Sequence, residues 1–567
     1  MALQSKRERI GPALRALETL LGRATAHVAA RVVEGDKLAS AKLDAEQLAA
    51  HGVAYLATEV EAARQIDAWL RRLEDAKTAT EIETRTAVLY VAELVRALRA
   101  GVNLGQTETI PLSEMGLTAT DLGDTLGDGA VATWADECTA AGEWLALTRL
   151  VRERGTGALG LDDEMLVTLQ AEFRKFADRE VKPIAQDVHR KDVLVPLEIL
   201  TKMGELGVFG LTIPEEFGGL GMGKTAMCVV TEELSRGYIG VGSLGTRAEI
   251  AAELILGGGT DAQKKDYLPR IAAGELLPTA VFTEPNNGSD LAHIQSRAKK
   301  ADDGSWRVHG QKTWITHACR ADLMTLLART KPDDAGYGGL SMFLAPKSRT
   351  GEEGRPEFVD RGLSGTEIKV LGYRGMKEYE LSFDDFVVPA DALLGGVEGQ
   401  GFKQLMATFE SARIQTAARG VGVAQAALEE GLRYGEQRVQ FGKPIVEFPR
   451  VARKVARMVV LVQAARQLTL FSARMKDSGK RCDLEAGMAK LLATRAAWEC
   501  ADASVQIHGG NGYAEEYVAS RLLVDARVLS IFEGANEIQA HVVARRLFEK
   551  ARSNEAPTKS NPTQEKR

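Results

Sequence analysis

Residues 506–539 read QIHGGNGYAEEYVASRLLVDARVLSIFEGANEIQ. This segment predicts a glycine-rich turn at 509–512, a helix over about Val518–Arg527, and then a lone acid, Glu533, between Phe532 and Gly534. A carboxylate with an aromatic side chain on one side and a glycine on the other is easily desolvated, and desolvation raises its pKa, as a general base requires. The alternative is a surface glutamate at the start of the next helix, which is the commoner place for this residue type.

The composition is that of an ordinary globular protein with several domains. At 567 residues the chain is too long for one compact core. Its hydrophobic fraction is 45%, its charged fraction 26% and its net charge −6, so charge predicts neither nucleic acid nor an anionic membrane as a partner. The five cysteines are far apart and form no C-x-x-C pair, which indicates a reducing compartment and argues against a structural zinc.

The N-terminal segment predicts no export signal. Residues 1–21 read MALQSKRERIGPALRALETLL, the pattern of an amphipathic helix without an uninterrupted apolar stretch or a small-residue cleavage site. Elsewhere no run approaches the roughly 20 apolar residues of a membrane span. We therefore expect a cytoplasmic protein that makes no membrane contact.

Four regions with different patterns of apolar residues follow one another along the chain. Apolar residues at three- and four-residue spacings predict helices throughout 1–155, where no acid, base and nucleophile gather, so a packing or oligomerisation module is expected. The pattern stays helical over 156–275, becomes a series of short β-like runs over 276–395, and is helical again over 396–553. Residues 554–567 are polar and are expected to be disordered. The fold class is therefore α+β and mostly α, with an antiparallel sheet or barrel in the middle of the chain.

One glycine pattern is rejected as a nucleotide site. Residues 240–245 read GVGSLG and match G-x-G-x-x-G, a pattern that binds dinucleotides only between a strand and a helix. The preceding residues, TAMCVVTEELSRGYI, predict a helix instead.

Three polar segments are candidates for binding a flat, phosphate-bearing cofactor. TEPNNGSD (283–290) is a turn that can present hydroxyl and N–H groups, and GQKTWIT (310–316) places Trp314 beside threonine on a strand. Arg438, in RYGEQRVQFGKPI, has the planar fork that suits a pyrophosphate. Taken singly, each segment has an ordinary alternative: an Asx-rich turn, a core tryptophan, and a surface ion pair at a helix end.

Six segments occur in a fixed order and together resemble the signature of one family. They are TEPNNGSD, GQKTWIT, YELSFDDFVVPADALLG, RVQFGKP, QIHGGNGY and IFEGANEIQ. They are similar to the signature segments of the acyl-CoA dehydrogenase family of flavoproteins, over about Leu161–Phe548. The resemblance implies an α-helical domain, a central β domain and a C-terminal four-helix bundle, with FAD between the last two. The 155 residues that precede this match would then be an extra helical domain.

Position by position, the resemblance implies a set of site residues. Glu533 is the expected catalytic base, and Arg413, at an expected helix start, lies near the CoA chain. The residues expected to bind FAD are Thr283, Ser289, Trp314, Thr316, Arg438, Phe441, Gln506, Gly509 and Gly510. Arg438 and Phe441 are expected to reach the FAD of a neighbouring subunit, which implies a homo-oligomer that is at least a dimer.

The same resemblance implies a reaction, α,β-dehydrogenation of a short, branched acyl-CoA thioester. Glu533 would remove the α-proton, FAD would accept the β-hydride, and electron-transferring flavoprotein would accept the electrons. If the acyl chain carries a distal carboxylate, Arg247 is a candidate partner for it; the alternative is an exposed arginine at a helix N-terminus. Three readings stay open: dehydrogenation of isobutyryl- or glutaryl-CoA, an acyl-CoA oxidase, and a non-catalytic assembly protein on the same fold.

Overall fold

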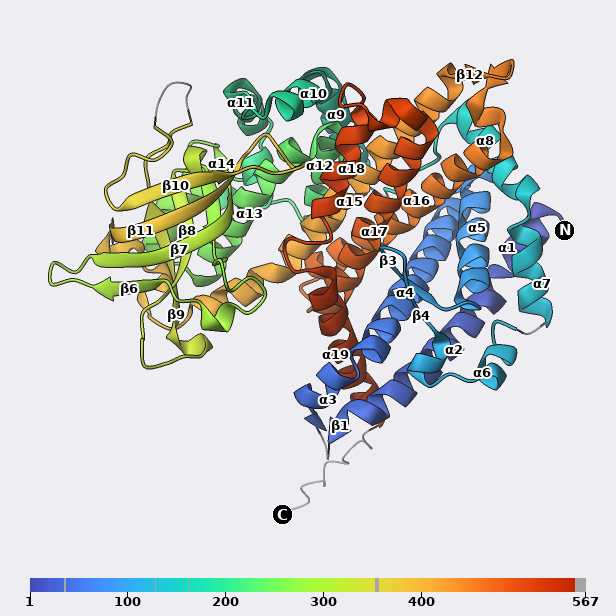
Figure 1. The fold of residues 1–567 in the computed structure, drawn as a ribbon, viewed down its shortest axis with the longest axis horizontal. Helices are drawn as coiled ribbons and strands as arrows, with labels where there is room; N and C mark the ends of the chain where they lie inside the picture. Colours follow the sequence, from blue (N-terminus) through green and yellow to red (C-terminus); the bar gives the residue numbers. More distant parts are fainter. Residues whose placement is uncertain (35–36, 128, 162, 352–355, 556–567) are drawn as a thin grey trace, which may run out of the picture.

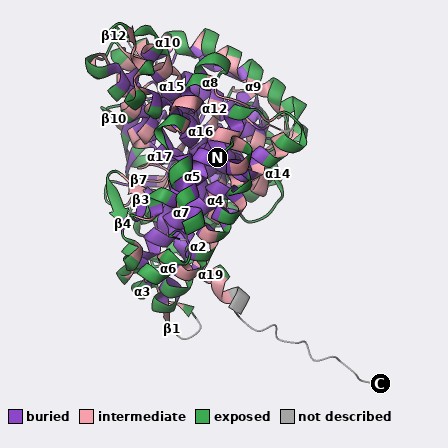
Figure 2. Cartoon of the chain, turned by 90° about the vertical axis from the view of Figure 1, so that its right-hand side faces the viewer, coloured by how far each residue is buried: buried purple, intermediate pink, exposed green. Residues whose placement is uncertain are grey.

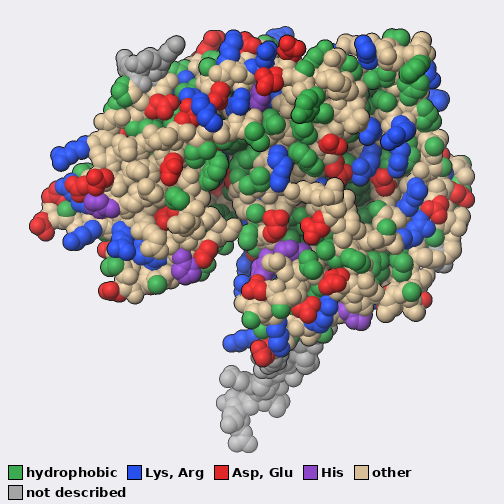
Figure 3. Space-filling view, viewed as in Figure 1, with side chains coloured by type: hydrophobic (Ala, Val, Ile, Leu, Met, Phe, Trp, Pro, Cys, Tyr) green, Lys and Arg blue, Asp and Glu red, His purple; other side chains and the backbone are tan. Residues whose placement is uncertain are grey.

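The computed structural model describes residues 1–34, 37–127, 129–161, 163–351 and 356–555. A β lobe is joined to a large helical body, in which the N-terminal helices lie beside the C-terminal helices (Figure 1). Acidic and basic side chains are interspersed over the face in Figure 3, and the surface is hollowed where the β lobe meets the helical body. Within the described residues, no helix is long and apolar enough to cross a membrane. Most of the predicted tail, residues 556–567, lies outside them.

The N-terminal extension is mainly helical, as predicted, but it also contains two short hairpins. Its helices are α1 (Leu3–Glu8), α2 (Ile10–Val32), α3 (Ser40–Ala45), α4 (Gln47–Asp75), α5 (Glu81–Leu98), α6 (Ala119–Gly123), α7 (Gly129–Cys138) and α8 (Ala141–Arg154). β1 (Val33–Glu34) pairs with β2 (Lys37–Leu38), and β3 (Val102–Gly105) pairs with β4 (Glu108–Ile110). The prediction of helix throughout was therefore wrong at both strand pairs. Gly101 (φ 132°) lies between α5 and β3, and Gly105 (φ 91°) ends β3; both adopt positive φ angles, which glycine does readily.

The next region is helical, as predicted. It contains α9 (Glu164–Phe176), a π-helical turn (Ala177–Val181), α10 (Lys182–Lys191), α11 (Leu197–Glu205), α12 (Lys224–Gly237), α13 (Ile239–Gly258) and α14 (Asp261–Ala272). The GVGSLG segment lies inside α13, so its rejection as a dinucleotide site is confirmed. Its glycines allow close packing, because a side chain on Gly242 would meet the Ser235 hydroxyl at 2.0 Å.

The β lobe is one mixed sheet of seven strands. These are β5 (Pro278–Val281), β6 (Arg297–Lys300), β7 (Trp306–Thr316), β8 (Leu323–Arg329), β9 (Leu340–Pro346), β10 (Leu363–Ile368) and β11 (Glu378–Val388). They are ordered β10-β11-β7-β6-β8-β5, and β9 also pairs with β8. The prediction of an antiparallel sheet holds for most pairs but is wrong for β8, which pairs in parallel with β5 and with β6. All seven residues of β8 are buried, as expected of a strand covered on both faces.

The C-terminal region is a bundle of long helices. It contains α15 (Gly401–Gln437), the hairpin β12 (Val439–Gln440) and β13 (Lys443–Pro444), α16 (Pro449–Asp477), α17 (Asp483–His508), α18 (Val518–Val528) and α19 (Asn536–Glu555). The helix predicted over Val518–Arg527 is thus confirmed as α18. Helices α15 and α17 approach closely, since a side chain on Gly420 would meet the Ala493 carbonyl oxygen at 2.9 Å.

The extension and the bundle share one hydrophobic core. A continuous cluster of buried apolar side chains runs from Ile10 in α2 through α4 and α5 into α16, α17 and α19, whereas the sheet has a separate core. Figure 2 shows the buried residues concentrated where these helices lie. The extension is therefore packed against the rest of the chain and is not a tethered module.

A buried ion pair crosses the same interface. Arg495 of α17 pairs with Glu59 of α4, and both side chains are almost completely shielded from solvent. Tyr90 of α5 donates to the second oxygen of Glu59 at 2.7 Å, and Arg495 also donates to the Asn103 carbonyl of β3 at 2.8 Å. These contacts fix the extension in register with α17.

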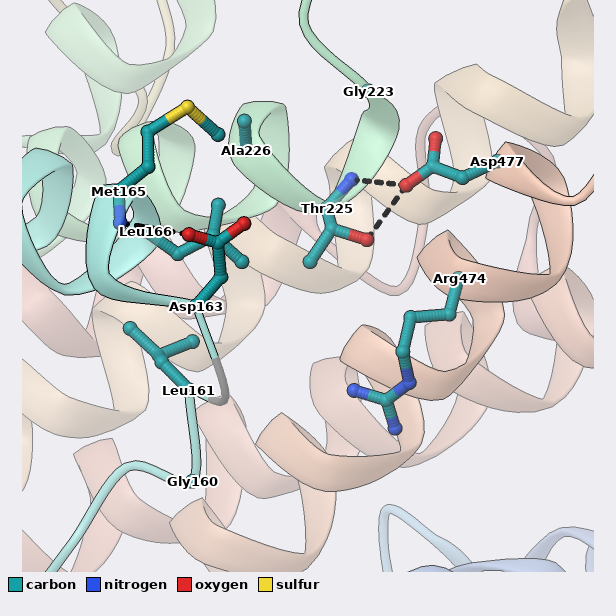
Figure 4. Close-up of a pocket in the computed structure, with 10 residues that line it drawn as sticks. All are labelled: Gly160, Leu161, Asp163, Met165, Leu166, Gly223, Thr225, Ala226, Arg474 and Asp477. Carbon is teal, nitrogen blue, oxygen red and sulfur yellow. Dashed lines mark hydrogen bonds between the residues drawn. The ribbon is translucent and has the colours of Figure 1, made fainter.

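The segment that joins the extension to the next region is packed as well. In this segment Gly160 is left-handed (φ 78°), with its backbone packed closely against Trp69 of α4. A cavity of about 330 Å³ is lined by residues from the start of α12 and the end of α16, together with Gly160, Leu161, Asp163, Met165 and Leu166 (Figure 4). There the N–H and hydroxyl groups of Thr225 donate to Asp477. None of the predicted site residues lines this cavity.

We predict that Glu59→Ala destabilises the protein strongly. Removing one partner of a buried pair leaves the Arg495 charge without compensation, which costs about 3–5 kcal/mol of unfolding free energy. The measurement is urea unfolding followed by circular dichroism. Asp187→Ala, which removes an exposed pair with Lys191, is the control and should leave the midpoint unchanged. Equal midpoints for the two variants would contradict a structural role for the Arg495–Glu59 pair.

Candidate active site

Glu533 lies in a tight turn between α18 and α19. Both Glu533 and Gly534 have left-handed backbone angles (φ 52° and 86°), which is uncommon for a residue with a side chain. The Asn536 N–H donates to the Ser530 carbonyl at 3.1 Å and closes the turn. The Glu533 side chain is only 13% exposed, so the reading of a surface glutamate at a helix start is wrong.

Two arginines and a threonine hold the Glu533 carboxylate. Arg419 of α15 donates to Oε2 at 2.5 Å, and the Thr416 hydroxyl, one turn earlier on the same helix, lies 2.5 Å from the same oxygen. Arg247 of α13 donates to Oε1 at 3.2 Å. Two helices, α13 and α15, therefore converge on one buried acid.

An aromatic pair supports the two guanidinium groups. The Tyr373 hydroxyl accepts from Arg419 at 3.3 Å and from Arg247 at 3.4 Å. The Phe532 ring lies 4.9 Å from the Arg419 guanidinium and packs edge-on against Tyr373 at 5.1 Å. The Tyr373 N–H in turn donates to Asp525 of α18 at 2.7 Å. The arginines are thus held by the buried Tyr373 and the half-buried Phe532.

This geometry reverses the predicted pKa shift of Glu533. Burial alone would raise the pKa of Glu533, as the sequence suggested, but the charges of Arg419 and Arg247 outweigh it and the pKa is lowered. The prediction failed because both partners come from distant segments. Arg419 and Thr416 were missed altogether; their one signal in the sequence is an arginine in the otherwise apolar run TAARGVGVAQAA.

The predicted Arg247 and Arg413 have different surroundings. Arg247 is buried within α13 and bonded to Glu533, so its reading as an exposed arginine is wrong. Arg413 is also buried, but well inside α15, so its placement at a helix start was wrong. Its guanidinium lies 5.7 Å from the Phe409 ring, and burial lowers its pKa. Among the described residues, no hydrogen bond joins Arg413 to Glu533.

The predicted residues of the β lobe lie along β7 and the turn beside it. Trp314 lies at a bulge of β7 opposite β11, has a left-handed backbone (φ 59°), and is 57% exposed. It is therefore not a core tryptophan. The Thr313 N–H donates to the Thr283 carbonyl at 3.0 Å, which places Thr283 next to this bulge. Ser289 is exposed in the polar turn that follows.

Buried polar atoms lie next to these residues without a partner. The Thr316 hydroxyl donates to one oxygen of Glu378 at 3.0 Å, while the other oxygen has no partner among the described residues. Both ring nitrogens of His317 are likewise unpartnered within the described part of the chain. Burial raises the pKa of Glu378 to about 8 and lowers the pKa of His317 to about 3, so both are neutral near pH 7.

The remaining predicted residues gather at another place, the end of the bundle where α15 and α17 stop. Arg438 ends α15, and Phe441, at the tip of the β12–β13 hairpin, is 93% exposed. Gln506, Gly509 and Gly510 are exposed at the end of α17. None of the contacts among the described residues joins this group to Glu533.

Comparison with known proteins decides the family. Three domain models of acyl-CoA dehydrogenases match the chain: the N-terminal domain over 163–275, the middle domain over 279–386 and the C-terminal domain over 399–548. The chain belongs to the acyl-CoA dehydrogenase family. It is therefore an oxidoreductase of that family.

Individual relatives differ in how much of the chain they cover. A (2S)-methylsuccinyl-CoA dehydrogenase of Cereibacter sphaeroides is 56% identical over 538 residues, which are 95% of this chain and 97% of that protein. The butyryl-CoA dehydrogenase structure from Megasphaera elsdenii (TM-score 0.63, 32% identity) covers 68% of this chain and 98% of its own. A glutaryl-CoA dehydrogenase from Mycobacterium smegmatis in complex with FADH2 (TM-score 0.62, 27% identity) covers 69% and 96%. The first relative thus matches the extension as well.

We predict that Arg419→Met raises the pKa of Glu533. Removing a cation beside a buried carboxylate favours its neutral form, so protonation moves about 1–3 pH units upward. The measurement is the infrared carbonyl band of the protonated carboxyl, assigned by its absence in Glu533→Gln.

The control is Arg236→Met, which removes another buried arginine, paired with Glu233 and Glu429 and not with Glu533. It should leave the Glu533 band at its original pH. An unshifted band in Arg419→Met would contradict the assigned cause of the lowered pKa.

Proposed function

We propose that the protein is an FAD-dependent acyl-CoA dehydrogenase that oxidises (2S)-methylsuccinyl-CoA to mesaconyl-CoA, a step of the ethylmalonyl-CoA pathway. One observation carries the choice of substrate: two buried arginines, Arg247 and Arg419, share the single carboxylate of Glu533. Glu378 is neutral and does not compensate the second cation. A substrate with its own carboxylate would balance that charge. The similarity to the Cereibacter sphaeroides enzyme supports the same substrate.

The residues of the β lobe fit a flavin. An indole left exposed at a bulge offers a flat face for stacking, and the unpartnered Glu378 and His317 atoms offer polar contacts to a ring edge. We expect Thr283, Ser289, Trp314 and Thr316 to hold one end of FAD. Bound FAD supplies the acceptor for the hydride that leaves the β-carbon, and electron-transferring flavoprotein is the acceptor that we propose for the electrons.

In this proposal, Glu533 is the base that removes the α-proton of the thioester. Its side chain is buried, so water does not compete for the proton, and its left-handed backbone directs it from the turn into the site. The Glu533 N–H is the proposed donor to the thioester carbonyl as negative charge develops there. A substrate carboxylate bound to Arg247 adds a negative charge beside Glu533. The pKa of Glu533 then rises, and the base becomes stronger when the correct substrate is bound.

The exposed aromatic tips favour a homodimer. Phe441 is 93% exposed and Tyr513 is 90% exposed, although large aromatic side chains are seldom left in water. Arg438, Phe441, Gln506, Gly509 and Gly510 would contact the FAD of the neighbouring subunit, so two copies are needed to complete each site. Arg413 is expected to lie near the CoA chain.

We predict that methylsuccinyl-CoA bleaches the flavin absorbance under anaerobic conditions, and that Glu533→Gln slows this reduction by a factor of about 10²–10⁴. The measurement is an anaerobic absorbance titration and stopped-flow trace, with butyryl-, isobutyryl- and glutaryl-CoA as competitors. Preferential bleaching by another thioester would agree with the family assignment but contradict methylsuccinyl-CoA as the substrate. Peroxide formation without an added acceptor would indicate an oxidase, and a protein without flavin would favour a non-catalytic role.

We further predict that Arg247→Met loses selectivity for the carboxylate-bearing substrate. A charge-assisted hydrogen bond contributes about 1.5–3 kcal/mol, so the kcat/KM ratio of methylsuccinyl- over butyryl-CoA should fall roughly 10- to 100-fold. Using the ratio cancels any effect on Glu533 that both substrates share. Arg236→Met should leave the ratio unchanged. A ratio that stays the same in Arg247→Met would show that this arginine does not bind the substrate carboxylate.

A further inference from the structure

Lys490 is a buried cation close to Glu533 that the proposed mechanism does not use. It lies on α17, with none of its surface exposed, and its Nζ donates a hydrogen bond to the Gly534 carbonyl. Among the described residues, no carboxylate lies within ion-pair distance of this ammonium group. A buried charge without an ionic partner is costly for folding, which favours a role in the turn over a role in stability.

The Gly534 carbonyl is a point at which the turn can be held. The left-handed backbone of Glu533 is unfavourable by about 1–2 kcal/mol and persists only when neighbouring contacts enforce it. Besides Lys490, the Gly534 carbonyl accepts one longer bond, from Gln539 Nε2 at 3.3 Å. Gly534 has a left-handed backbone (φ 86°), which a side chain would strain, and a side chain there would also displace the Gln539 amide group. Lys490 therefore makes the principal contact that orients this peptide.

The same face of α17 holds the other end of the turn. Thr494 lies one helical turn after Lys490, and its hydroxyl accepts a hydrogen bond from the Asn536 side-chain Nδ2 at 3.3 Å. Two residues of one rigid helix thus hold Gly534 and Asn536, which flank the turn on the side that follows Glu533.

We infer that Lys490 is a positioning residue for the general base: its bond to the Gly534 carbonyl fixes the left-handed turn that carries Glu533. The inference rests on the proposed function, in which Glu533 takes the α-proton.

The charges around Lys490 agree with this role. Arg413 and Arg419 face it from α15, Glu533 from the turn and Glu537 from α19. Burial lowers the pKa of Lys490 to about 7, although Glu533 opposes the shift. In turn, Lys490 is one of the cations that lower the pKa of Glu533, after Arg419 and Arg247.

The test compares the FAD-loaded variants Lys490→Met and Lys490→Gln with the wild type. Stopped-flow reduction by saturating methylsuccinyl-CoA is recorded as a function of pH, together with thioester affinity and thermal midpoint. In Lys490→Met the reduction rate constant should fall about 10- to 100-fold while affinity changes little, because a misplaced base affects chemistry more than binding. The acid limb of the pH profile should move to higher pH in both variants, since each removes a cation that lowers the pKa of Glu533. If Lys490→Met does not fold, Lys490→Gln still shows how loss of the Lys490 charge moves the acid limb of the pH profile.

Lys347→Met is the matched control. Lys347 is also a buried ammonium bonded to backbone carbonyls, those of Ala321 at 2.9 Å and Cys319 at 3.2 Å, but it lies in the β lobe away from the turn. Lys347→Met should leave the acid limb of the pH profile at its wild-type position. A wild-type rate and an unmoved acid limb in both Lys490 variants would overturn the inference. Glu533→Gln separates the positioning role of Lys490 from the proposed function. If the flavin of Glu533→Gln is reduced by methylsuccinyl-CoA at the wild-type rate, the proposed function is wrong, whatever the Lys490 variants show.

Discussion

The pairing of the Glu533 carboxylate with two buried arginines is the constraint on which the site depends. A buried carboxylate is tolerated only when its charge is matched, and Arg419 and Arg247 provide more positive charge than one carboxylate requires. This contact ties α13 and α15 to the turn between α18 and α19. Because the two arginine charges lower the pKa of Glu533 against the effect of burial, they also set how strongly this carboxylate, the proposed base, can act. The same positive charges therefore affect both the stability of the site and the selectivity that we propose for it.

A similar constraint on α16 explains why the N-terminal extension packs against the bundle. Buried residues occur all round this helix from Val455 to Ala473, so neighbouring elements cover it on every side. α15 and α17 cover part of it, and α4, α5 and α8 of the extension cover the rest. The shared core and the Arg495–Glu59 pair make this cover permanent. Helix α17, which carries Arg495, also carries Lys490 and Thr494 under the Glu533 turn, so the extension supports the helix that holds the base.

The sequence predicted what is local. Helical spacing identified α18, short β-like runs located the sheet within 276–395, and a lone acid between Phe532 and Gly534 identified the residue that we propose as the base. Short-range patterns missed the β1–β2 and β3–β4 pairs, whose strands span only two to four residues. They also gave the wrong direction for the pKa of Glu533, because its partners lie on α13 and α15, far away in the chain. Arg419 was missed because an arginine inside a helix is ordinarily expected to reach solvent.

Charge rather than shape explains how this site would reject ordinary fatty acyl chains. An apolar chain placed beside Arg247 would keep the guanidinium away from water and leave its Nε, which has no partner among the described residues, unpaired; packing contacts do not repay that desolvation penalty. Sites built around a polar group of the substrate reject analogues that lack it far more strongly than apolar pockets reject a missing methylene. The fixed Tyr373 and Phe532 prevent the arginines from turning aside to avoid this penalty. Selectivity and base strength then depend on the same two side chains, so neither could change in evolution without affecting the other.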